Sequence, residues 1–171
     1  MLVGHLAVGL VAKRIEPKIS LGTGILAALL SDLLVFPLLI AGIEHFDTLP
    51  GATLNRSVGR DIVYSHGLLS NIIWAALFAT IYFLHRRYPR GALLLFAVVL
   101  SHWLLDFISH RPDMPLAPGT HQVFGLGLWN SLPATLVVEG GYCCWQLSSM
   151  LARHVQRSAP EATHSGSALS C

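Results

Sequence analysis

Four long apolar segments constrain the fold of this 171-residue chain more than any other feature. They run from Ile19 to Ile43, Ile62 to Leu84, Gly91 to Ser109 and Leu128 to Ala152. A helix needs about 20 apolar residues to cross the hydrocarbon of a bilayer. Only 12% of the residues are charged, whereas a soluble domain carries roughly 25%. The sequence therefore predicts an all-α, polytopic membrane helix bundle with four transmembrane helices.

The two ends of the chain differ from these segments. The first twelve residues are apolar but would make a helix only about 18 Å long, so we expect a short or re-entrant N-terminal helix. Residues 158–171 are polar and rich in Ser, Ala and Gly, which predicts a disordered tail. One membrane-embedded helical domain is expected over residues 1–157.

The lysines and arginines are divided unevenly between the connections. Eight lie after residue 12, in the 85–90 loop or in the tail: Lys13, Arg14, Lys18, Arg86, Arg87, Arg90, Arg153 and Arg157. Three lie in the 44–61 and 111–127 loops: Arg56, Arg60 and Arg111. By the positive-inside rule, the first group and the C-terminus are expected to be cytoplasmic. Such short basic clusters anchor topology and predict no nucleic-acid partner.

Six ionisable side chains interrupt the apolar segments: His5, Asp32, His66, His102, Asp106 and Glu139. Each costs roughly 2.5 to 3.5 kcal/mol to insert at mid-helix, so each needs a physical reason. His102 and Asp106 are four residues apart and share one helix face. A histidine and a carboxylate placed so can bind one divalent cation together. A hydrogen-bonded pair without metal is the alternative.

The depth of these residues predicts that they meet. At 1.5 Å per residue, Asp32, His102 and His66 lie about 20, 17 and 24 Å from the cytoplasmic side, all in the outer half. Three separate helices thus place ionisable groups at similar depth. His5 is expected to join them from the N-terminal helix, the alternative being a surface histidine near a frayed terminus.

The expected metal ligands are His5, Asp32, His66, His102 and Asp106. Imidazole and carboxylate donors without a thiolate suit zinc, manganese or iron(II), and two ions bridged by a carboxylate are a further possibility. Asp32 is also a candidate proton acceptor. Glu139 is a second candidate for that role, or an outer partner, or a protonated glutamate bonded to a neighbouring helix.

Four motifs, GHLAVG, LAALLSD, SHGLL and SHWLLDF, together resemble the bacterial inner-membrane metal-dependent hydrolase family over roughly residues 1 to 150. The resemblance implies a multi-pass protein of the bacterial inner (plasma) membrane that hydrolyses its substrate with a metal. The family pattern usually has PD-x-D, where this chain has Ser31, Asp32, Leu33 and Leu34. The HxxxD helix is also similar to a ligand helix of zinc-dependent phospholipases C, which suggests a phosphoester or lipid head group.

Three functions compete. The first is a membrane-embedded metal-dependent hydrolase that acts on a lipid-linked or small-molecule substrate among membrane lipids. The second is a cation or proton transporter, because intramembrane His and Asp also form ion pathways. The third is a non-catalytic membrane protein in which the polar network holds the helices together. The inner halves of the expected spans are nearly all apolar, which favours a one-sided site over a transport path.

Overall fold

The computed structural model describes residues 2–48, 57–59, 62–120, 122–141, 144 and 148. These residues are mostly helical, as the sequence predicts. The helices are α1 (Leu2–Ile15), α2 (Leu21–Ala28), α3 (Leu30–Ile40), α4 (Val63–His66), α5 (Leu68–Arg86) and α6 (Pro89–Ser109). A 3-10 turn, η1 (Leu128–Asn130), and a helical stretch at 132–141 follow.

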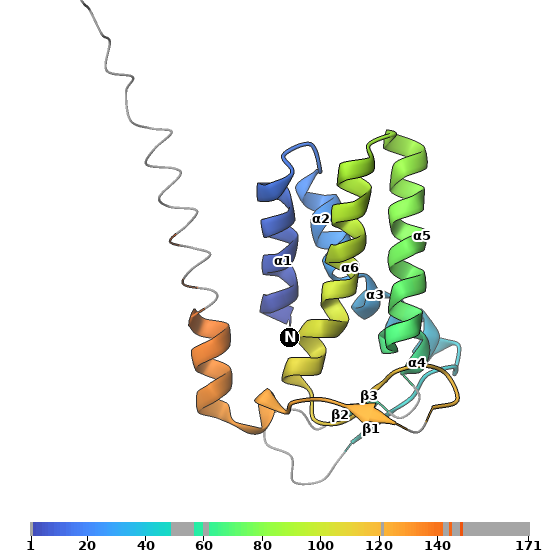
Figure 1. The fold of residues 1–171 in the computed structure, drawn as a ribbon. Helices are drawn as coiled ribbons and strands as arrows, with labels where there is room; N and C mark the ends of the chain where they lie inside the picture. Colours follow the sequence, from blue (N-terminus) through green and yellow to red (C-terminus); the bar gives the residue numbers. More distant parts are fainter. Residues whose placement is uncertain are drawn as a thin grey trace, which may run out of the picture.

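Two small antiparallel strand pairs lie between the helices. Strand β1 (Phe46–Thr48) pairs with β2 (Ser57–Gly59), with Phe46 opposite Gly59. Strand β3 (Met114–Pro115) pairs with β4 (Val123–Phe124), with Met114 opposite Phe124. Both pairs lie at the lower end of the bundle in Figure 1.

The long helices stand side by side, with α6 in contact with α1, α2 and α5 (Figure 1). The α1–α2 and α5–α6 connections both lie at the upper end, so the basic residues in them share one end of the molecule. The N-terminus of α1, the C-terminal end of α6, and α3 and α4 lie toward the lower end.

The number of membrane spans differs from the expectation of four. Helices α5 and α6, with 19 and 21 residues, are long and apolar enough to cross a membrane. The α2–α3 pair makes a third candidate if it counts as one span despite its 56° bend. Within the described residues the number is therefore two or three. The predicted fourth span, Leu128–Ala152, runs beyond the described residues, as do the tail at 158–171 and the boundary after residue 157.

Two of the expected spans are interrupted. The first, Ile19–Ile43, is broken at Leu29, where φ is −103° and ψ is 10°. The second, Ile62–Leu84, is broken at Gly67, whose backbone is extended between α4 and α5. A Cβ at Gly67 would collide with the carbonyl oxygen of Val63. His66 therefore ends a separate one-turn helix and does not lie inside a long span, which corrects its expected place.

Apolar side chains fill the bundle on the side of the α1–α2 and α5–α6 connections. The core residues are Ala12, Ile19, Ala27, Ala28, Ala75, Leu95, Val98 and Val99. Helices α1 and α2 come close at Gly9 and Gly24, where a Cβ on Gly24 would lie 2.8 Å from the Gly9 carbonyl oxygen. Small residues of this kind allow membrane helices to pack backbone to backbone. The polar cluster lies below this core.

Candidate metal centre

The five predicted ligands meet at the lower end of the bundle. His5 lies near the start of α1, Asp32 in the first turn of α3, and His66 at the end of α4, while His102 and Asp106 lie one turn apart on α6. The four residues other than Asp32 are buried. The Asp32 side chain is 39% exposed, so it is the member of the cluster that solvent reaches.

Three donor atoms, from His66, His102 and Asp106, form one group that could hold a metal ion, and Asp32 lies beside the two histidines. For metal–ligand bonds of about 2.0 to 2.1 Å, the donors of a tetrahedral site are about 3.3 to 3.4 Å apart. The observed distances are His102 Nε2 to Asp106 Oδ2, 3.2 Å; His66 Nε2 to Asp32 Oδ1, 3.5 Å; His102 Nε2 to Asp32 Oδ1, 3.6 Å; and His66 Nε2 to Asp106 Oδ2, 4.0 Å. This buried cluster of histidines and aspartates could hold a metal ion.

The break between α2 and α3 orients His102. Ala28 is the last residue of α2, and the final carbonyls of a helix have no partner within it. His102 Nδ1 lies 2.8 Å from the Ala28 carbonyl oxygen, which can only accept, so Nδ1 carries the proton. In neutral imidazole, Nε2 then keeps its lone pair. Nε2 is buried, has no hydrogen-bond partner and faces two carboxylates, which is the arrangement of a metal-ligating histidine.

His66 is oriented by the residue before it. Its Nδ1 lies 2.7 Å from the Ser65 hydroxyl, which leaves Nε2 facing Asp32 and Asp106. Ser65 is in turn hydrogen-bonded to Glu44, a carboxylate that is only 1% exposed. Sequence interpretation did not assign Glu44 to the site, because it lies in an expected loop, more than 20 residues from any predicted ligand except Asp32.

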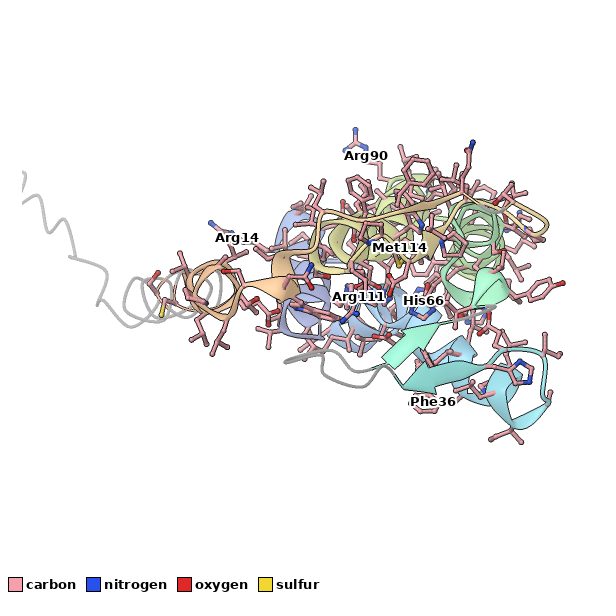
Figure 2. All side chains as sticks on the ribbon, turned by 90° about the horizontal axis from the view of Figure 1, so that it is seen from below. Arg14, Phe36, His66, Arg90, Arg111 and Met114 are labelled. Carbon is pink, nitrogen blue, oxygen red and sulfur yellow. The ribbon has the colours of Figure 1, made fainter. Side chains whose placement is uncertain are left out.

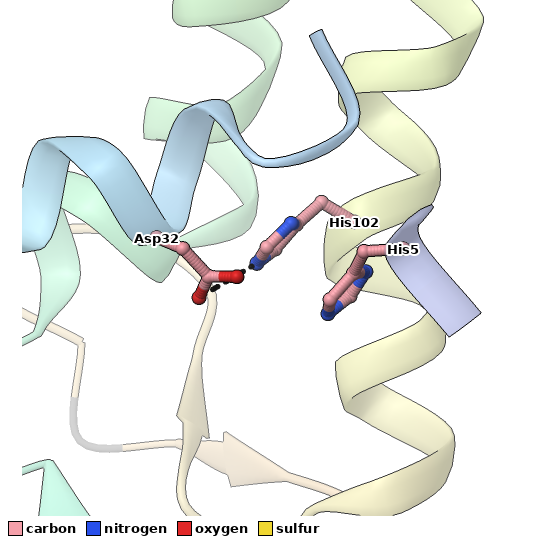
Figure 3. A group of neighbouring side chains, drawn as sticks. All are labelled: His5, Asp32 and His102. Carbon is pink, nitrogen blue, oxygen red and sulfur yellow. Dashed lines mark ion pairs between the residues drawn. The ribbon is translucent and has the colours of Figure 1, made fainter. Parts of the chain in front are cut away.

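His5 lies against His102 and contacts the other oxygen of Asp106. Its ring stacks on His102, with centroids 3.8 Å apart and planes 7° from parallel (Figure 3). Its Nε2 is 3.1 Å from Asp106 Oδ1. The two Asp106 oxygens therefore serve different histidines. His5 also belongs to a second donor group with Asp32 and His102. His5 is thus a buried member of the cluster and not a surface histidine.

Glu139 is placed outside this cluster. Its Oε1 accepts a hydrogen bond of 3.1 Å from Trp129 Nε1. The Trp129 ring packs on His110, whose Nε2 is 3.9 Å from Asp106 Oδ1. Glu139 thus approaches the cluster through the Trp129 and His110 rings. Its expected role as a general base gains no support from a contact.

Backbone hydrogen bonds hold the 111–127 loop against the site end of the bundle. Leu69 N donates to Leu116 O at the start of α5, and Leu126 N donates to Phe107 O near the end of α6.

Viewed from below, His66 lies among the helices, whereas Phe36 of α3 lies at the periphery (Figure 2). On α3, Asn71 of α5 donates a 2.7 Å hydrogen bond to Ser31, which fixes the backbone beside Asp32.

Comparison with known proteins found no match among family models, curated proteins or solved structures. The resemblance to membrane metal-dependent hydrolases rests on the four sequence motifs.

Proposed function

We propose that this protein is a membrane-embedded, metal-dependent hydrolase. In this proposal, His66, His102 and Asp106 hold one divalent ion, and Asp32 faces the substrate side of it. The observation that carries the proposal is the pair of histidines whose Nδ1 atoms are engaged and whose Nε2 atoms point at the same carboxylates. Zinc suits two imidazoles and carboxylates at this spacing, and manganese or iron(II) are the alternatives.

The uneven exposure of the cluster favours catalysis over a purely structural role. Structural zinc sites are closed by four protein ligands, whereas catalytic sites use three and keep one position open. His66, His102 and Asp106 side chains are at most 8% exposed, and Asp32 is 39% exposed. Asp32 therefore lies where water can enter, and we assign it the role of proton acceptor. It remains within ligand distance and could close the resting site.

A bound divalent ion would make water a nucleophile near neutral pH and polarise a phosphoryl or carbonyl oxygen. We propose a phosphoester or lipid-linked substrate that approaches from the site end of the bundle. Of the lysines and arginines in the described residues, Arg111 alone follows α6 at that end, directly after its C-cap His110. A guanidinium there favours an anionic substrate group.

The apolar core argues against the transport alternative. A cation or proton path would require polar groups through both halves of the bundle. Between the cluster and the basic end, the core instead consists of alanine, valine, leucine and isoleucine. Among the described residues, no other cluster of histidine and acidic side chains could hold a metal.

The test is metal analysis and hydrolysis by the full chain purified in detergent. Wild type is expected to carry about one zinc per chain and to hydrolyse a member of a phospholipid, lipid-phosphate and ester panel. His102→Ala should lose both. His85→Ala is the matched control, because His85 is an exposed histidine in the last turn of α5. Metal bound without hydrolysis, together with cation movement across liposomes, would replace the hydrolase by a transporter.

A further inference from the structure

Glu44 is a deeply buried acidic residue that the proposed mechanism does not use. It is 1% exposed, and both of its carboxylate oxygens are hydrogen-bonded. Oε1 accepts from the backbone N–H groups of Tyr64 and Ser65, at 2.9 and 2.7 Å, and Oε2 accepts from the Ser65 hydroxyl at 2.7 Å. Glu44 thus binds the N-terminal turn of α4, the helix that ends with His66.

We infer that Glu44 is a positioning residue that sets the tautomer of His66 through Ser65, and so presents His66 Nε2 to the metal. For its effect on metal binding, this inference rests on the proposed function. The three residues form one chain of hydrogen bonds, Glu44 to Ser65 to His66, in which the links are each 2.7 Å long. All three side chains are buried.

The position of each proton in this chain follows from whether each group can donate or accept a hydrogen bond. An ionised carboxylate only accepts hydrogen bonds, so the Ser65 hydroxyl must donate its single proton to Glu44. The Ser65 oxygen is then an acceptor toward His66, which places a proton on Nδ1. A neutral His66 with Nδ1 protonated has its lone pair on Nε2, the atom that faces Asp32 and Asp106. Partners of this kind fix ligand orientation in metal sites.

The same order excludes a serine nucleophile. In a Ser–His–acid triad, the histidine lies between the serine and the carboxylate, and it takes the serine proton. Here the serine lies between the carboxylate and the histidine, and it gives its proton to Glu44. Ser65 is also fully buried. Acyl transfer by Ser65 is therefore inconsistent with the geometry.

Glu44→Gln tests the inference because glutamine has the shape of glutamate but reverses the direction of the hydrogen bonds from residue 44 through Ser65 to His66. The two backbone N–H groups need an acceptor, so the amide oxygen takes the Oε1 position and the NH₂ group takes the Oε2 position. The NH₂ group then donates to Ser65, whose own proton turns to His66 Nδ1. His66 is left with its proton on Nε2, the atom that would otherwise bind metal.

The experiment uses full-length protein in detergent, with Zn²⁺ titrated against a chelator. Loss of such an orienting partner costs about 10- to 100-fold in metal affinity, and we expect that loss for both Glu44→Gln and Ser65→Ala. Ser109→Ala is the matched control, because Ser109 is equally buried but bonds to the backbone of its own helix. Its affinity for Zn²⁺ should stay unchanged.

A second readout does not need metal. Nitrogen chemical shifts of ¹⁵N-histidine-labelled, metal-free protein should show His66 with the proton on Nδ1 in wild type and on Nε2 in Glu44→Gln, with His66→Gln to assign the signal. An unchanged tautomer in Glu44→Gln would overturn the inference. If wild type binds no Zn²⁺ but the tautomer changes as expected, the proposed function fails and the positioning role stands. Equal loss of affinity in Ser109→Ala would reduce the effect to general destabilisation.

Discussion

Asp106 is the residue on which the cluster depends most. Oδ1 is 3.1 Å from His5 and 3.9 Å from His110, and Oδ2 is 3.2 Å from His102 and 4.0 Å from His66. A buried carboxylate is strongly unfavourable unless it is paired. Four surrounding imidazoles supply that pairing, and a metal ion bound at the proposed site would add to it. Asp32, in contrast, is 39% exposed.

Isosteric substitution of the two aspartates should separate their roles. Asp106→Asn removes a buried ligand, so bound zinc should fall at least tenfold and hydrolysis should fall with it. Asp32→Asn should keep most of the zinc and lower kcat by about 10²- to 10⁴-fold, the range of a general base. Metal content and steady-state kinetics on the same preparations measure both effects. Equal loss of zinc in the two variants would make Asp32 a ligand and not the base.

The residues differ in how far sequence could predict them. His102 and Asp106 are four apart on one helix, so their pairing follows from local geometry. His5 and Asp32 were predicted from the cost of burying them in apolar segments, and the structure brings them to the cluster. Glu44 and the Ala28 carbonyl give no such signal, because their roles come from contacts 21 and 74 residues away along the chain.

At the scale of elements, two interruptions in the helices position the ligands of the site. The break at Leu29 frees the Ala28 carbonyl for His102, and the break at Gly67 lets α4 turn His66 inward. Sequence could not predict the first break, because residues 26–30 read Leu-Ala-Ala-Leu-Leu, without glycine or proline. Pro37, the residue that does suggest a kink, lies within α3. Hydropathy alone therefore overestimated the number of continuous membrane-spanning helices.

Gly67→Ala tests the break beside His66. The new Cβ would collide with the Val63 carbonyl oxygen, so α4 must shift and carry His66 with it. We expect zinc affinity to fall by at least tenfold while the circular dichroism of the protein stays helical. Gly140→Ala is the control, since a Cβ there meets nothing within 4 Å. Unchanged zinc affinity in Gly67→Ala would mean that α4 does not fix the ligand.

Packing of α1 on α2 can be tested with two glycines of one helix. A Cβ on Gly24 would lie 2.8 Å from a backbone oxygen of Gly9, whereas the atom nearest a Cβ on Gly22 is 3.9 Å away. Gly24→Ala should lower stability by about 1 to 3 kcal/mol through overpacking. Gly22→Ala should be neutral or slightly stabilising. Thermal unfolding in detergent measures the difference, and equal midpoints would contradict the close approach.

At the scale of the whole molecule, the basic residues and the candidate metal site lie at opposite ends. The basic residues of the α1–α2 and α5–α6 connections share one end, and the histidine and aspartate cluster lies toward the other. Positive residues mark the cytoplasmic side of a membrane protein. We therefore expect the cluster to open on the non-cytoplasmic side.

Reporter insertions on either side of α6 test this orientation. A reporter placed after Tyr88, the N-cap of α6, should be cytoplasmic, and one placed at Gly119 should be external. Gly119 has open space around it, so the insertion should not disturb packing. Alkaline phosphatase and green fluorescent protein give opposite signals on the two sides. The same sign at both positions would contradict α6 as a span.

The hydrogen bond between His5 and Asp106 joins residues 101 positions apart. During synthesis, His5 can therefore bond to Asp106 only after α6 has been made. Contacts between residues so far apart in the chain form late in folding. A nascent chain that ends before α6 lacks His102 and Asp106, the two residues of the cluster that α6 carries. On the proposed function, the metal would therefore bind only after α6 has been made and packed against α1.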